Sequence, residues 1–136
     1  MHLLDTNIIS ETRDRRRGDR RALAWIDSVE TTSLYLSAMT DYELELGVLA
    51  AERRDPVHGE RLRHWLTVVR EEFDGRILPV TPEIARICAR LNTPDRRPYA
   101  DSMIAATGLH HGLTIVTRNE RDFRVQGLSV LNPFRG

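Results

Sequence analysis

Four acidic side chains stand where an α/β protein would bring them to one edge of its sheet. They are Asp5, Glu43, Asp101 and Asp122. Asp5 directly follows the apolar residues Leu3 and Leu4, and each of the others follows a strand-like run or lies at a helix start. Strand ends and helix starts meet at the carboxyl edge of a parallel sheet, where ligands bind. We therefore expect the four to form one acidic pocket.

Such a pocket needs a cation. Neighbouring carboxylates repel one another and burial raises their pKa values further, so a positive ion must offset their charge. Ligands that are all oxygen favour Mg²⁺ or Mn²⁺ over zinc. An ion held in this way can polarise a phosphate oxygen and activate a water. A phosphodiester is therefore the natural substrate class. Without a metal, an acidic pocket would repel nucleic acid.

Three of the acids also have a purely structural explanation. Thr40 and Glu43 match a helix capping box. Asp101 lies in the first turns of a predicted helix, where the helix dipole favours negative charge, and Asp122 could stabilise a turn through a local hydrogen bond. Asp5, at the end of an apolar strand, is the exception. The functional interpretation depends on convergence of all four.

The elements that would position these acids alternate along the chain. Strands are predicted to end at Leu4 and to span residues 34–37, 77–80, 113–117 and 128–131. Helices are predicted after residue 6 and over residues 22–29, 41–52, 62–73, 82–91 and 98–112. Thr81-Pro82 is typical of a helix start, and Gly112 suits a helix C-terminal cap. Alternating strands and helices predict a mainly parallel five-stranded sheet covered on both faces. Without a repeat or linker, residues 1–136 are expected to form a single domain.

Composition excludes several classes of protein. The 20 basic residues balance the 20 acidic ones, and every basic residue is arginine. The absence of lysine argues against P-loop NTPases, haloacid-dehalogenase-like phosphatases and response-regulator receivers, which all use one. The single cysteine, Cys88, shares a predicted apolar helix face and permits no internal disulfide, and His110 and His111 lack zinc-site spacing. With an acid at position 5 and no long apolar run, we expect a cytoplasmic protein without a membrane span.

Four motifs in order give a resemblance to a known family. They are Leu3-Leu4-Asp5-Thr6-Asn7-Ile8-Ile9-Ser10, Tyr42-Glu43-Leu44-Glu45-Leu46-Gly47, Tyr99-Ala100-Asp101-Ser102-Met103-Ile104-Ala105-Ala106-Thr107 and Val116-Thr117-Arg118-Asn119-Glu120-Arg121-Asp122-Phe123. Together they make nearly the whole chain resemble the PIN-domain ribonucleases, in particular the VapC toxins of toxin–antitoxin pairs. The resemblance implies a PIN-like three-layer α/β/α fold.

The resemblance also assigns site residues. Asp5 and Asp101 resemble the two main metal ligands and Glu43 the second acid of the pocket. Some members have an aspartate where Asn119 stands; we assign Asp122 as the fourth acid and Asn119 as a neutral pocket residue. A second tier follows from the same motifs: Thr6 and Thr117 for orienting a water or carboxylate, and Arg118 for contact with RNA.

The implied activity is that of a magnesium-dependent, or manganese-dependent, endoribonuclease. It would leave 5′-phosphate and 3′-hydroxyl ends, form a homodimer and be silenced by a VapB-like antitoxin. The alternative is a PIN-like module that binds RNA or protein without cutting.

Three further features lie outside the pocket. Glu45 lies two residues from Glu43, and such residues face different sides of a helix, so we expect it to be solvated. The segment from Arg13 to Arg21 carries six arginines against two aspartates and could reach an RNA backbone. An apolar stripe of residues 42, 46, 49 and 50 is expected to be core, or else a dimer or antitoxin surface.

Overall fold

A five-stranded parallel sheet organises the chain. The computed structural model describes residues 1–135. The strands are β1 (His2–Leu4), β2 (Leu34–Ser37), β3 (Ile77–Leu78), β4 (Thr114–Val116) and β5 (Val130–Leu131). Their spatial order is β3-β2-β1-β4-β5, with every neighbouring pair parallel. The expected α/β class and five parallel strands are confirmed, and β1 occupies the centre of the sheet.

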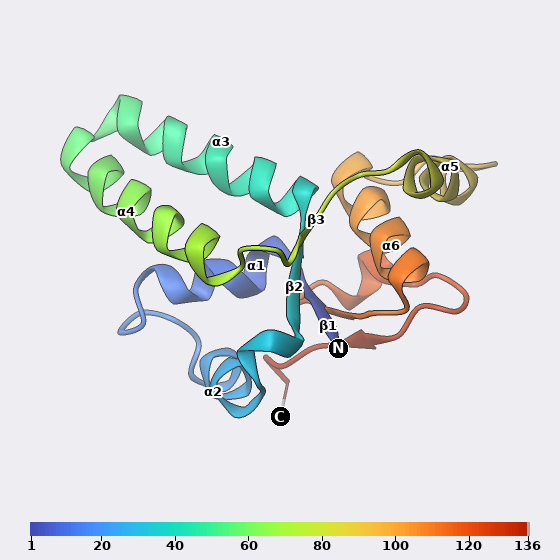
Figure 1. The fold of residues 1–136 in the computed structure, drawn as a ribbon, viewed down its shortest axis with the longest axis horizontal. Coiled ribbons are helices and arrows are strands. Elements are labelled where there is room, and N and C mark those ends of the chain that lie inside the picture. Colours follow the sequence, from blue (N-terminus) through green and yellow to red (C-terminus); the bar gives the residue numbers. More distant parts are fainter. Residues whose placement is uncertain (136) are drawn as a thin grey trace.

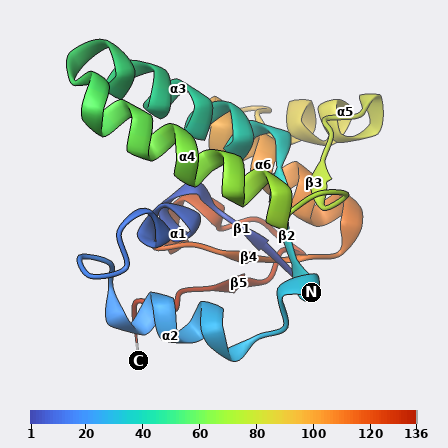
Figure 2. The ribbon, with the colours of Figure 1, turned by 60° about the vertical axis from the view of Figure 1, so that its left-hand side comes forward.

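Helices cover both faces of this sheet (Figure 1). The α-helices are α1 (Thr6–Ile9), α2 (Arg20–Ser28), α3 (Ala38–Arg54), α4 (Pro56–Glu72), α5 (Pro82–Leu91) and α6 (Tyr99–His111). Three 3-10 helices join them: η1 (Ser10–Arg13), η2 (Thr31–Ser33) and η3 (Glu120–Phe123). α3 and α4 form a long antiparallel pair, which Figure 2 shows above the sheet. Within residues 1–135, no helix is long and apolar enough to cross a membrane.

The core has two main layers because neighbouring residues of a strand point to opposite faces. Leu4 and Val116 pack on the α3–α4 side of the sheet. Leu3 and Ile115 pack on the opposite side with Ile104 of α6. A smaller cluster between α5 and α6 contains Cys88, which is buried as expected. This arrangement gives the expected three layers and places the acidic residues at the carboxyl edge of the sheet.

The predicted helix signals near residues 81 and 112 are confirmed, whereas the predicted start of α3 was wrong. The Thr81 hydroxyl accepts a hydrogen bond from the Ile84 amide at 3.3 Å, and Gly112 has a φ of 66° at the end of α6. α3 begins three residues earlier than expected, since Ser37 caps it by accepting a hydrogen bond from the Met39 amide at 3.0 Å. The chain therefore passes from β2 into α3 without a loop.

Candidate functional site: an acidic pocket at the carboxyl edge of the sheet

Asp5 lies among the four acids, whose charges act on one another, and we refer to this group of acids as the acidic pocket. It ends β1, caps α1 and is only 5% exposed. Its Oδ1 accepts a hydrogen bond from the Thr6 amide at 2.8 Å, and its Oδ2 accepts from the Thr117 hydroxyl at 2.8 Å. Burial raises the pKa of Asp5, and nearby Glu43 acts in the same direction, although the hydrogen bonds oppose the shift. A buried carboxylate held this rigidly is poised to interact with a cation.

Glu43 reaches the pocket from α3. Its Oε1 accepts a hydrogen bond from the Thr6 hydroxyl at 2.6 Å, which links Glu43 to the residue next to Asp5. The capping-box interpretation of Glu43 was wrong, because Ser37 caps the helix and Thr40 lies inside it. Its Oε2 has no hydrogen-bond or ion-pair partner within residues 1–135. One oxygen of Glu43 is fixed and the other is available.

Asp101 carries the clearest electrostatic signal of the pocket. It occupies the first turn of α6, where the helix dipole would lower the pKa of a carboxyl. Its pKa is instead raised to about 6, first by burial and then by the charges of Asp5, Asp122 and Glu43. The dipole explains a preference for an acid at this position but not the raised pKa. Burial first, and the charges of three neighbouring carboxylates second, do explain it.

The fourth corner of the pocket is formed by η3. Asp122 lies there, half-buried, and its charge acts on Asp101. Its backbone amide donates to the Asn119 carbonyl at 3.0 Å, but its carboxylate takes part in no hydrogen bond within residues 1–135. Asn119 is exposed, and its amide donates to the Thr117 hydroxyl at 3.0 Å. Of these two residues, Asp122 is the one whose charge acts on the other acids.

Hydroxyl and amide groups hold the carboxylates in place. Thr6 fixes Glu43, and Thr117, which is fully buried, fixes Asp5. The sequence analysis missed Asn7 as a positioning residue. Its Nδ2 donates to Asp5 Oδ2 at 3.1 Å, and its Oδ1 accepts from the Arg118 amide at 3.0 Å. The sequence signal for this role was the position of Asn7 two residues after Asp5, since at that spacing a side-chain amide can donate a hydrogen bond to the carboxylate.

Arg118 is an exposed residue at the edge of the site. Its guanidinium lies over the Phe134 ring, 4.0 Å from the ring centroid. Its backbone carbonyl accepts a hydrogen bond from Asn132 at 3.2 Å. The side chain is thus directed toward the C-terminal segment, and its predicted contact with RNA stays a prediction.

The donor set fits a hard divalent cation. No arginine or histidine within residues 1–135 forms an ion pair with any of the four acids. In the same part of the chain, no three acidic, histidine or cysteine side chains form a ready cage around one ion. Mg²⁺ does not need such a cage, because it usually keeps several waters and binds through one or two carboxylates. An uncompensated group of oxygens suits that mode, and the four acids lack the cysteine and histidine partners that dominate zinc sites.

Glu45 is half-buried and ion-paired, whereas the sequence predicts a freely solvated side chain. It faces away from the acidic pocket, as the two-residue spacing required, and meets two arginines of α4. Arg63 donates to both of its oxygens at 2.7 Å, and Arg70 approaches one of them at 2.9 Å. Hydrogen bonds from Arg63 lead the effects that lower the pKa of Glu45 to about 2. Arg63 also bonds Glu52, so this network joins α3 to α4.

The apolar stripe of α3 is not core. Tyr42, Leu46 and Leu49 are 58%, 53% and 47% exposed, and Ala50 is exposed beside them. Leu44 and Val48 on the other side of the helix fill the core instead. The stripe leaves an apolar surface next to the helix face that carries Glu43, so its interpretation as core was wrong.

Comparison with known proteins gives consistent matches over the whole chain. The model of the PIN domain matches residues 2–127. Toxin FitB of Neisseria gonorrhoeae is 38% identical over 98% of this chain and 99% of its own length. VapC ribonuclease Y4jK of Sinorhizobium fredii is 37% identical over 98% of each chain. The crystal structure of FitAcB from Neisseria gonorrhoeae superposes with a TM-score of 0.89 at 37% identity and covers 99% of both chains.

Proposed function

Because this chain belongs to the PIN-domain family, and within it to the VapC/FitB-type ribonuclease toxins of toxin–antitoxin systems, we propose that it is a magnesium-dependent endoribonuclease. The acidic pocket is its active site, and RNA phosphodiesters are its substrates. One observation carries the proposal: Asp5 is buried and fixed by Thr117, Glu43 is tied to the adjacent Thr6, and the charges of both acids reach Asp101. Within residues 1–135, no arginine or histidine pairs with these acids, and a metal ion would neutralise their charge.

The contacts of each residue assign it a role in the proposed reaction. Asp5 and Asp101 would hold the ion, with Thr117 and Asn7 fixing the orientation of Asp5. A divalent cation bound there supplies charge neutralisation and Lewis acidity toward a phosphate oxygen. Glu43 keeps Oε1 on Thr6 and presents Oε2, which can orient the attacking water and take its proton. Asp122 completes the pocket beside Asp101. Cleavage would leave 5′-phosphate and 3′-hydroxyl ends.

Incubation with RNA tests this proposal directly. Purified protein is mixed with total RNA in magnesium, in manganese and in chelator, and new 5′ ends are mapped. We expect cuts only with a divalent ion. Asp5→Asn should keep the fold and lose the cuts, whereas the control Asp95→Asn, at an exposed residue outside the pocket, should cut normally. Cleavage by Asp5→Asn would remove Asp5 from its role.

The second candidate function is a PIN-like module that binds RNA or protein without cutting it. Intact acids at all four motif positions favour the enzyme. RNA binding without metal-dependent cuts on any RNA would instead support the binding module.

The proposal extends to protein partners. We infer a homodimer and a VapB-like antitoxin that silences the enzyme. The exposed apolar stripe of α3 fits an interface of this kind, because such side chains gain free energy when they leave water. Light scattering should show a dimer for the wild-type protein. The Leu46→Arg variant should be monomeric in the same measurement. Co-expression with the small protein encoded beside it should relieve toxicity. If that small protein did not copurify with this chain, the antitoxin assignment would be refuted.

A further inference from the structure

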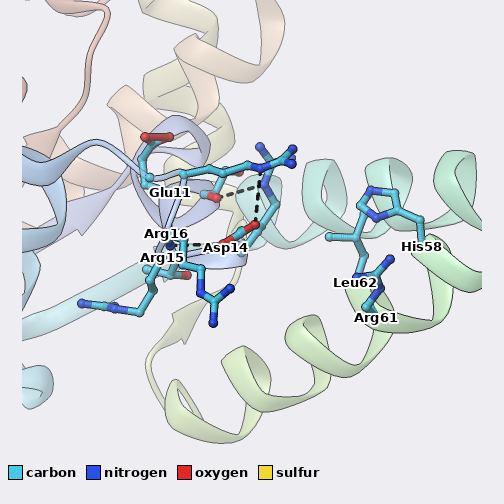
Figure 3. Close-up of a pocket in the computed structure, with 12 residues that line it drawn as sticks. Glu11, Asp14, Arg15, Arg16, His58, Arg61 and Leu62 are labelled. Carbon is cyan, nitrogen blue, oxygen red and sulfur yellow. Dashed lines mark hydrogen bonds and ion pairs between the residues drawn. The ribbon is translucent and has the colours of Figure 1, made fainter.

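A cavity lined by arginines lies away from the acidic pocket. It has a volume of about 640 Å³ and is formed between the segment from residue 10 to residue 18 and the first turns of α4 (Figure 3). Its basic side chains are Arg13, Arg15, Arg16, Arg17, His58 and Arg61, and we refer to this group as the arginine pocket. The arginine-rich segment is visible in the sequence, whereas its proximity to α4 is not. The fold brings Arg61 to it from more than 40 residues away.

The arginine pocket has excess positive charge. Five arginines line it against two acids, Glu11 and Asp14, so its formal charge is +3 with His58 neutral. Glu11 already accepts a hydrogen bond from the Asp19 amide at 2.8 Å. Arg15 is paired with Asp27 at 2.6 Å. In contrast, the guanidinium groups of Arg16 and Arg61 have no acidic or hydrogen-bonding partner within residues 1–135, which leaves their donors available.

The two walls of the pocket are tied together. The Trp65 indole of α4 donates to the Thr12 hydroxyl at 3.0 Å, and that hydroxyl donates to the Ile9 carbonyl at 2.7 Å. The Asp14 carbonyl accepts the amides of Arg17 and Gly18, which closes the arginine-bearing turn. The backbone of such a pocket is ordered before any ligand arrives, so binding must order only its arginine side chains.

The arginine pocket also has a fixed position relative to the active site. α1 and η1 form one helical run from Thr6 to Arg13. Eight residues of α-helical and 3-10 rise span roughly 12–16 Å. At about 3.4 Å per stacked nucleotide, this distance corresponds to about four nucleotides of one strand. An RNA strand at the acidic pocket would be long enough to reach the arginines.

We propose that the arginine pocket binds backbone phosphates of the RNA strand that is cut at the acidic pocket, an inference that rests on the proposed function. The protein has no net charge, and its catalytic acids repel phosphates, so attraction for RNA must come from a local concentration of cations. Arginine guanidinium groups match phosphate geometry with paired donors. The contacts are to the backbone and therefore add affinity without sequence preference.

RNA binding by a charge-matched pair of variants tests this inference. Arg16→Ala/Arg61→Ala removes the two available guanidinium groups, and Arg90→Ala/Arg96→Ala removes two exposed arginines elsewhere. Affinity for a labelled single-stranded RNA is measured by fluorescence anisotropy in chelator, over a range of salt. The first variant should bind about tenfold more weakly, and its slope of log affinity against log salt should fall by about 1.4, since each phosphate contact contributes about 0.7. The second should match the wild type.

Equal affinity and equal salt slope in both variants would overturn the inference. So would unchanged RNA binding together with weaker binding of a polyglutamate peptide, because the pocket would then serve an acidic protein segment. All four arginines are exposed, and circular dichroism verifies that both variants fold. Binding in chelator does not require cleavage, so the two proposals can fail separately. If the arginine pocket binds RNA but the protein never cuts RNA, the proposed function is refuted. If the protein cuts RNA and its RNA affinity does not depend on the arginine pocket, this inference alone is refuted.

Discussion

Replacing Asp101 by asparagine should stabilise the metal-free protein while abolishing cleavage. The folded-state pKa of Asp101 is about 6, against an ordinary value of 3.8 for an aspartate. A raised acid pKa means that the folded state binds more protons than the unfolded state between these two values, so stability falls as pH rises from about 4 to about 6. Above pH 6, the folded protein therefore carries the full unfavourable effect of this ionised group.

The size of this effect follows from the shift. A difference of 2.2 pKa units, from 3.8 to about 6, corresponds to about 3 kcal/mol at most. Asp101 keeps partial contact with solvent, which screens the repulsion, and we therefore expect Asp101→Asn to gain about 1–2 kcal/mol at pH 8. At pH 4 the wild-type carboxyl is already protonated in the folded state, and most of the gain should disappear.

Urea unfolding in chelator at pH 8 and pH 4 measures both quantities. Asp95→Asn, at an exposed acid outside the pocket, is the control and should change stability by less than about 0.5 kcal/mol at either pH. Magnesium should stabilise the wild type at pH 8 more than it stabilises Asp101→Asn. Our explanation would be refuted if Asp101→Asn were less stable than the wild type at pH 8, or if its gain were the same at both pH values.

Four other substitutions probe features outside Asp101. Thr117→Val should lower cleavage about 10–100-fold with the fold intact, because it removes only the hydroxyl that orients Asp5; an unchanged rate in a gel-based cleavage assay would contradict that role. Arg63→Met should cost about 1–2 kcal/mol at pH 7 in urea unfolding. Since the pKa of Glu45 is depressed to about 2, the stability it contributes is present above pH 4.5 and lost as pH falls toward 2, so a pH-independent cost would refute the network. Gly59→Ala should destabilise the protein strongly, because its new Cβ would lie 2.5 Å from Glu52 Cα. Gly47→Ala, whose new Cβ would have nothing within 4 Å, should instead stabilise the protein by about 0.5–1 kcal/mol. Equal shifts in melting temperature would contradict the close approach of α3 and α4 at Gly59.

Local patterns predicted the elements better than they predicted their contacts. The strand at residues 34–37 and the helix starting at Pro82 were found correctly, since buried runs and caps are properties of a few adjacent residues. The start of α3 was missed because two capping patterns compete there, and the serine at the end of β2 forms the cap. Glu45 was misjudged because its arginine partners are 18 and 25 residues away on another helix.

The acidic pocket was predicted from one physical rule, the meeting of strand ends in a parallel sheet, together with the family resemblance. That rule places Asp5 but does not identify the groups that hold it. Asn7 could be suspected only because it lies two residues away, whereas the arginine pocket depends on Arg61, which no local pattern joins to Arg16. Contacts between distant segments require the fold itself.

The hydrogen bond between Asp5 and Thr117 makes the timing of synthesis relevant. These residues are separated by 112 positions, and β1 lies between β2 and β4 in the sheet. A ribosome adding roughly 5–20 residues per second needs about 6–22 s to travel from one to the other. During that interval the first acid of the pocket exists without the hydroxyl that orients it, and without Asp122. On the proposed function, a growing chain lacks activity until these residues have been added, and truncation before β4 should abolish cleavage.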